Sequence, residues 1–82
     1  MLERKIYENK VPQMMKELRK TTGLSQKKFG QTLGIQRESV AKYEGGKRLP
    51  DFRVLLELQR IYGITPMQLA GETEWEVEGD KR

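Results

Sequence analysis

Apolar residues recur at three- and four-residue spacings over residues 11–71, a pattern typical of amphipathic helices packed in a small bundle. The first helix is predicted to begin at Pro12, where a missing N–H costs nothing, and to end at Thr21–Gly23. Its apolar face is predicted to comprise Val11, Met14, Met15 and Leu18.

Two short helices are predicted next, joined by a tight turn. Ser25 is a suitable N-cap for the earlier helix, and Gly34 ends it. The later helix is predicted to run from Gln36 or Arg37 to Glu44. The side chains expected to face inward are Phe29, Leu33, Val40 and Tyr43.

Gly30, Gly34 and Val40 are spaced as a helix-turn-helix requires. That motif needs a small residue where its helices touch, a residue that tolerates positive φ in the turn, and an apolar anchor under the second helix. Glycine inside a free helix costs about 1 kcal/mol relative to alanine. Gly30 therefore indicates close contact between the two helices rather than a break.

A fourth helix is predicted from an Asp51 cap to about Tyr62, and Thr65-Pro66 opens a short fifth helix. One face of the fourth helix is expected to hold Phe52, Leu55, Leu58 and Tyr62. A second apolar stripe indicates either a central place in the core or a dimer interface, and it consists of Val54, Leu58 and Ile61. Five helices with no strand pattern among them predict an all-α bundle.

The tail alternates acidic and apolar-leaning residues over residues 73–78, which is the period of a strand. A lone strand needs a partner, so one interpretation is a two-chain ribbon in which Trp75 and Val77 join the dimer interface. The other interpretation is a disordered acidic tail with Trp75 resting on the fifth helix.

The chain is divided by these patterns into an N-terminal extension (residues 1–10), a helix-turn-helix domain (11–71) and an acidic tail (72–82). The extension has three open interpretations: a further helix, a basic arm along DNA, or a loosely packed terminus. Residues 1–71 hold 14 Lys/Arg and 7 Asp/Glu, a net charge of +7, whereas residues 72–82 hold 2 and 5, a net charge of −3. A basic body indicates either a polyanionic partner or simply well-solvated helices.

The composition argues against several classes of function. The chain has no Cys and no His, so thiolate and imidazole metal sites and a histidine general base are absent. No helical pair of carboxylates is directed at an apolar pocket, and we expect neither an enzyme nor a cofactor. No apolar run is long enough for a membrane span and no signal-peptide pattern is present, so the expected compartment is the cytoplasm.

The ordered set of motifs resembles the Xre/Cro-like (lambda-repressor-like) helix-turn-helix family. The resemblance covers about residues 11–71 and rests on Gly23-Leu24-Ser25-Gln26, Phe29-Gly30, Leu33-Gly34-Ile35, Val40, Tyr43-Glu44-Gly45-Gly46-Lys47, Pro50, Leu55-Leu56-Glu57-Leu58 and Tyr62-Gly63-Ile64-Thr65. It implies a five-helix DNA-binding domain that acts as a homodimer on a palindromic operator. The family often has alanine where Gly30 stands, so we expect glycine to keep the fit and loosen the second helix.

The resemblance also implies roles for individual residues. The recognition helix, about residues 36–44, would enter the major groove, and Gln26 would bond a phosphate at the start of the second helix. Arg19 and Glu44 would form a structural ion pair. The full set of DNA-contacting residues that the resemblance implies is Ser25, Gln26, Gln36, Arg37, Glu38, Ser39, Lys42, Lys47 and Arg48.

Side-chain chemistry agrees with the implied DNA contacts of Arg37 and Gln36 and leaves the role of Glu38 open. Arg37 can make two parallel hydrogen bonds to guanine, worth about 1–3 kcal/mol of discrimination, and Gln36 suits adenine in the same way. Glu38 either accepts from a cytosine amino group or pairs with a neighbouring cation. That cation is either Arg37 or Lys42, and Lys42 stands at the favourable i+4 position for a helical ion pair.

Three functions are consistent with the sequence. The leading hypothesis is a transcriptional repressor that binds DNA as a homodimer. An antitoxin that binds operator DNA and also a toxin, through its tail, is the second. The third, suggested by an acidic Glu38 on the reading face, is a protein–protein interaction module.

Overall fold

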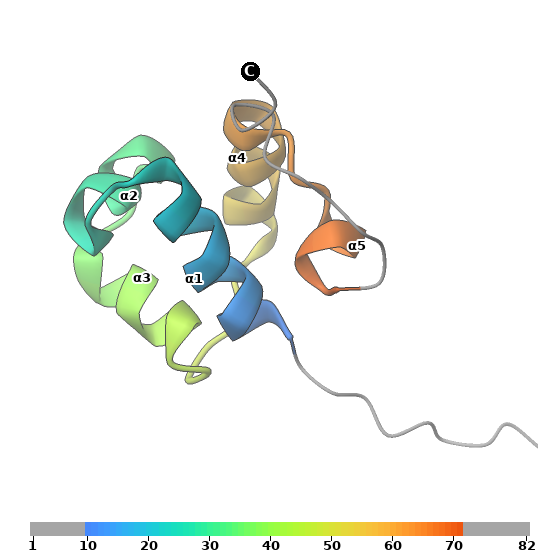
Figure 1. Ribbon diagram of the computed structural model, residues 1–82, viewed down its shortest axis with the longest axis horizontal. Coiled ribbons are helices and arrows are strands. Elements are labelled where there is room, and N and C mark those ends of the chain that lie inside the picture. Colours follow the sequence, from blue (N-terminus) through green and yellow to red (C-terminus); the bar gives the residue numbers. More distant parts are fainter. Residues whose placement is uncertain (1–9, 72–82) are drawn as a thin grey trace, which may run out of the picture.

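The structure, a computed structural model, describes residues 10–71 of the chain, and these residues form five helices without a strand. The prediction of a five-helix all-α bundle is therefore confirmed, while the predicted strand at residues 73–78 lies outside the described residues. Figure 1 shows α2 and α3 on one side of α1, and α4 and α5 on the other. The helices are α1 (Val11–Thr22), α2 (Gln26–Leu33), α3 (Arg37–Glu44), α4 (Phe52–Tyr62) and α5 (Pro66–Leu69).

Side-chain caps define where three of the helices begin. Ser25 Oγ accepts a hydrogen bond from the Lys28 amide at 3.1 Å, and Asp51 Oδ1 accepts from the Val54 amide at 3.0 Å. At α5, Thr65 and Gln68 form a reciprocal capping box. All three caps stand where the sequence predicts them, because each satisfies backbone donors that have no partner inside the helix.

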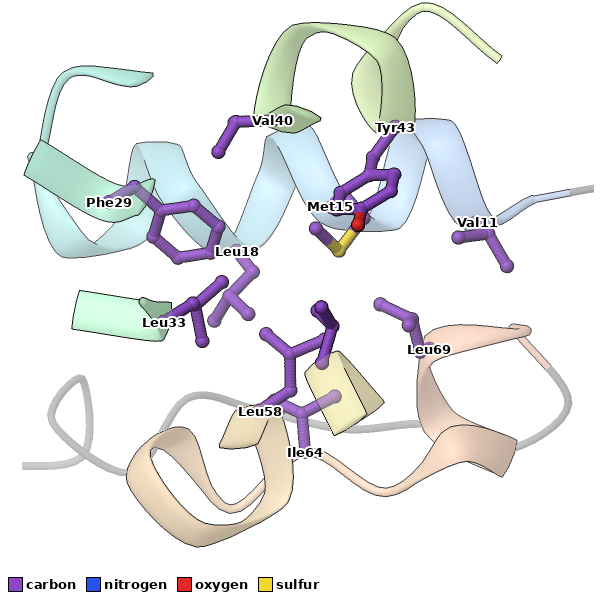
Figure 2. Close-up of a cluster of buried hydrophobic side chains, with 11 residues drawn as sticks. Val11, Met15, Leu18, Phe29, Leu33, Val40, Tyr43, Leu58, Ile64 and Leu69 are labelled. Atoms are coloured by element: carbon purple, nitrogen blue, oxygen red, sulfur yellow. The ribbon is translucent and has the colours of Figure 1, made fainter. Parts of the chain in front are cut away.

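The core lies where the two halves of the bundle meet α1. Figure 2 shows Phe29 and Tyr43 converging with Leu58 on the buried face of α1. Each large apolar side chain removed from water contributes about 1.5–3 kcal/mol to folding. The buried apolar residues are Val11, Met15, Leu18, Phe29, Leu33, Val40, Tyr43, Val54, Leu58, Ile64 and Leu69.

At Gly30, α2 comes close to α3 and to the turn that joins the two helices. A methyl group built on Gly30 would stand 2.7 Å from the Ile35 carbonyl oxygen and 3.3 Å from Val40 Cγ2. The expected close helix contact is thus confirmed. The space is tighter than we expected, since even alanine would require the backbone of the turn to move.

The fourth helix departs from its predicted face. Val54 and Leu58 are buried in the core, while Phe52 is 72% exposed. Residues along a helix are about 100° apart, which places Phe52 almost opposite Val54. The prediction that Phe52 faces inward is wrong.

The same burial corrects part of the predicted dimer interface. Val54 and Leu58 cannot meet a partner, because their side chains are already enclosed within one chain. Ile61 remains accessible, and Trp75 and Val77 lie outside the described residues.

Candidate DNA-binding surface

The start of α3 is exposed to solvent. The opposite face of the same helix is buried in the core. Val40 and Tyr43 are buried, whereas Gln36, Arg37, Glu38 and Lys42 are exposed. Gln36 is the N-cap residue of α3, yet its side chain makes no capping hydrogen bond. Its amide thus remains available for an external partner.

An open depression of about 440 Å³ lies beside this end of α3. It joins the first half of the recognition helix to α2 across the turn. Its lining includes charged side chains of both signs, two side-chain amides and one apolar side chain: Lys27, Gln31, Ile35, Gln36, Arg37 and Glu38. The structure therefore brings together three of the predicted base-reading residues.

Glu38 associates with Arg37 rather than with Lys42. Its Oε2 lies 3.9 Å from Arg37 Nη2, with both side chains more than half exposed. Among residues 10–71, no ion pair joins Glu38 to Lys42, so of the two candidate cations Arg37 is the one beside which Glu38 lies. An exposed pair at this distance is worth about 0–1 kcal/mol, so it leaves Arg37 able to move.

Arg48 is held against α3 by two neighbours. Its guanidinium carbon lies 5.4 Å from the centre of the Tyr43 ring, and Nη2 donates to Ser39 Oγ at 3.0 Å. Ser39, one of the DNA-contacting residues that the resemblance implies, thus already has an internal partner. Lys47, in the same loop, is exposed.

The end of α3 carries a polar network around Glu44. Arg19 Nε donates to Glu44 Oε2 at 2.7 Å and Arg19 Nη2 donates to Oε1 at 3.1 Å, so the pair is bidentate. The side chains are only 16% and 4% exposed, respectively. Arg19 Nη1 also donates to the Leu24 carbonyl at 3.1 Å, which ties α1 to the start of the helix-turn-helix.

Gln26 is part of this network. Its Nε2 donates to Glu44 Oε1 at 3.1 Å, a contact that the sequence alone did not indicate. The bond fixes which way the amide faces and leaves its second N–H and its oxygen uncommitted. Gln26 thus stands at the start of α2 with a preset orientation.

The electrostatics of the network favour its charged form. Burial of the Glu44 carboxyl acts to raise its pKa, but the hydrogen bonds from Arg19 and Gln26 outweigh that effect and lower it below the ordinary value. The same hydrogen bond from Arg19 to Glu44 raises the pKa of the guanidinium. The predicted pairing of these two residues is therefore present in the structure.

Two lysines that the sequence interpretation did not single out adjoin the surface. Lys27 and Lys28 occupy the first turn of α2, where the partial positive charge of the helix dipole disfavours a cation. Lys27 also lines the depression beside α3. Their placement against the dipole was a signal in the sequence for an anionic partner at this helix start.

Residues 15–69 match the model of a helix-turn-helix family. The SPbeta prophage-derived uncharacterized HTH-type transcriptional regulator YonR of Bacillus subtilis (strain 168) is 39% identical over 51 residues, which are 62% of this chain and 47% of YonR. The uncharacterized HTH-type transcriptional regulator YgzD of the same organism is 37% identical over 50 residues, 61% of this chain and 76% of YgzD.

The HTH-type transcriptional regulator ImmR, also of Bacillus subtilis (strain 168), is 33% identical over 60 residues, 73% of this chain and 47% of ImmR. The matched part thus spans about half the length of YonR and ImmR. No solved structure gives a significant match. Among residues 10–71, no helix has the length and apolarity that crossing a membrane requires.

Proposed function

The chain belongs to the Xre/lambda-repressor-like helix-turn-helix family, and from this premise we propose that it is a sequence-specific, double-stranded DNA-binding transcriptional repressor that acts as a homodimer. The observation that carries the proposal is the exposed start of α3 on a buried anchor. A helix presented in this way can enter the major groove without the fold having to open.

Base recognition is assigned to the first residues of α3. Arg37 suits guanine O6 and N7, and Gln36 suits the adenine N6 and N7 edge. Glu38 lies beside Arg37 and can either orient it or accept from a cytosine amino group. Lys42, one turn further along, contacts a base or a phosphate.

Phosphate contacts are assigned to the two ends of the motif. At the start of α2, Gln26 and the backbone amides face an anion together with Lys27 and Lys28. At the other end, Lys47 and Arg48 bind the backbone from the loop after α3. Residues 25–48 contain six Lys/Arg and two Glu, a net charge of +4, which suits a polyanion.

We attribute repression to occupancy of the operator by the bound homodimer. A homodimer on a palindromic operator places its two recognition helices in successive major grooves, about 10 bp apart. A protein bound in this way blocks other proteins from the same stretch of duplex. The printed names of the relatives, all HTH-type transcriptional regulators, support a role in transcription.

The salt dependence of binding tests this function. Phosphate contacts release counterions, so the affinity for duplex DNA should fall steeply and log-linearly as salt rises. Fluorescence anisotropy of a labelled duplex at several salt concentrations measures the slope. Complete insensitivity to salt would count against DNA and favour the protein–protein interaction hypothesis.

A further inference from the structure

An exposed apolar patch begins directly after the DNA-binding loop. We define the α4 patch as Phe52 and Leu56, one turn apart on α4, together with Leu49 in the loop that leads into the helix. These side chains are 72%, 50% and 60% exposed, respectively. Large apolar side chains gathered on one surface are a mark of an interaction site rather than of a solvated face.

The patch is on the side of α4 that the core does not use. Val54 and Leu58 face inward, and the helical period turns Phe52 and Leu56 outward. Folding of one chain therefore leaves half or more of each of these two side chains in water. Their burial requires something outside the described bundle.

The charge of α4 and its cap, which carry Phe52 and Leu56, distinguishes this part of the patch from the DNA-binding surface. Residues 51–62 contain two Arg and two acidic residues, a net charge of zero. Arg60 and Glu57 are already paired, with Arg60 Nη2 and Glu57 Oε1 2.5 Å apart. Two copies that approach through their +4 helix-turn-helix segments repel each other, whereas two neutral α4 faces do not.

We propose that the α4 patch is the docking site for a second copy of this chain. The inference rests on the proposed function, which requires a dimer, and assigns that dimer a surface. In a two-fold interface the same patch serves both subunits, so Phe52 and Leu56 of each copy form an apolar centre. A stable interface covers about 800 Å² of each partner, so polar neighbours on α4 form its rim.

The position of the patch leaves DNA recognition free. Leu49 follows Arg48 directly, so the dimer contact begins where the phosphate-binding loop ends. In Figure 1 that loop leads from the end of α3 to the start of α4. Pairing through α4 joins two recognition surfaces without covering either α3.

The first test is the mass of the full chain in solution as a function of concentration, by analytical ultracentrifugation. The wild-type chain should self-associate, and Phe52→Glu or Leu56→Glu should raise the dimer dissociation constant at least about tenfold. Since half or more of each side chain is exposed, thermal melts followed by circular dichroism should be unchanged at concentrations low enough that wild type and variants are all monomeric. Met67→Glu is the matched control: Met67 is 56% exposed on α5, and the same substitution there should leave the dimer intact.

Three results would overturn the assignment. These are a wild-type chain that stays monomeric at every concentration, a dimer that Met67→Glu breaks and Phe52→Glu does not, and an effect of Phe52→Glu that vanishes when residues 72–82 are deleted. The last would mean that the acidic tail, not a second copy, covers the patch.

DNA binding separates this inference from the function on which it rests. Phe52→Glu should weaken binding to a duplex with two half-sites at least about tenfold and leave binding to a single half-site unchanged. Equal binding of wild type and variant to the two-half-site duplex would contradict the docking site alone. A wild-type chain that binds no duplex contradicts the proposed function, while the ultracentrifugation result stands.

Discussion

The two ends of α3 hold their polar side chains in opposite ways. At its end, Glu44 is nearly enclosed and receives three hydrogen bonds from Arg19 and Gln26. At its start, the Gln36 side chain makes no capping hydrogen bond, and within residues 10–71 Arg37 has only a loose ion-pair neighbour at 3.9 Å. Polar groups that are paired internally specify the fold, whereas polar groups that are exposed and uncommitted can specify a ligand.

The contrast also suits the base recognition proposed for α3. A recognition helix must be placed rigidly, or the gain from each base contact is lost in ordering the protein. The Glu44 network supplies that placement by joining α1, α2 and α3. The exposed side chains at the start of α3 are free to adjust to the bases that the proposal assigns to them.

The largest effect on stability should follow from removing the ion pair at the end of α3. Glu44→Ala leaves Arg19 without its partner in a largely buried position, and the free energy of unfolding should fall by about 3 kcal/mol. Urea denaturation measures this change. The control is Glu57→Ala, which removes an exposed pair with Arg60 and should change stability by less than about 0.5 kcal/mol. Equal losses of stability in the two variants would contradict the claim that the Glu44 network contributes far more than an exposed ion pair.

A smaller loss should follow at the contact between α2 and α3. Gly30→Ala gains about 1 kcal/mol of helix propensity but forces a methyl group against the Ile35 carbonyl oxygen. We expect the crowding to prevail and the net free energy of unfolding to fall by about 1–2 kcal/mol. Gln31→Ala, on the exposed side of the same helix, is the control. A more stable Gly30→Ala variant would show that the turn relaxes freely.

Phosphate contacts should give a smaller effect, spread over all DNA sequences. Lys47→Ala should weaken binding to every duplex by a similar factor, about fivefold, and reduce the salt slope by about 1. Gln26→Ala should also weaken all sequences alike, without that change in slope. Arg53→Ala, a cation on α4 outside the motif, serves as the control. A loss confined to one sequence would instead place Lys47 or Gln26 at a base.

The smallest expected effect is a loss of folding stability at acidic pH. Because the pKa of Glu44 is lowered in the folded chain, the unfolded chain binds protons first as pH falls below about 4.3. The stability from the network is therefore full above that pH and is lost as pH falls through the folded-state pKa. Thermal melts from pH 7 to pH 3 should show this loss. It should be reduced in Glu44→Gln, which cannot ionise; an identical profile would assign the acid sensitivity to other carboxylates.

Local signals in the sequence accounted for most of the fold. Caps at Ser25, Asp51 and Thr65 and the glycine at position 34 act within a few residues, so their consequences can be predicted without knowing the tertiary structure. The face of α4 could not be predicted in this way. Phe52 and Val54 are both apolar, and only the packing of α4 into the shared core decides which of the two is buried.

The candidate site could be predicted from the sequence to a similar extent. The exposed positions of α3 follow from helical period, and the pairing of Arg19 with Glu44 followed from resemblance to the family. The bond from Gln26 to Glu44 and the stacking of Arg48 on Tyr43 join residues from different elements. Such contacts depend on three-dimensional placement that no local pattern encodes.

Selection of bound duplexes from a random DNA pool, carried out in parallel with the wild-type chain and Arg37→Ala, tests the central claim most directly. The account predicts that the wild-type chain enriches a palindrome. It also predicts that the variant loses preference at one position of each half-site, a discrimination of about 1–3 kcal/mol. Enrichment of no sequence by the wild-type chain, or an identical palindrome for both proteins, would contradict the claim that the start of α3 recognises bases.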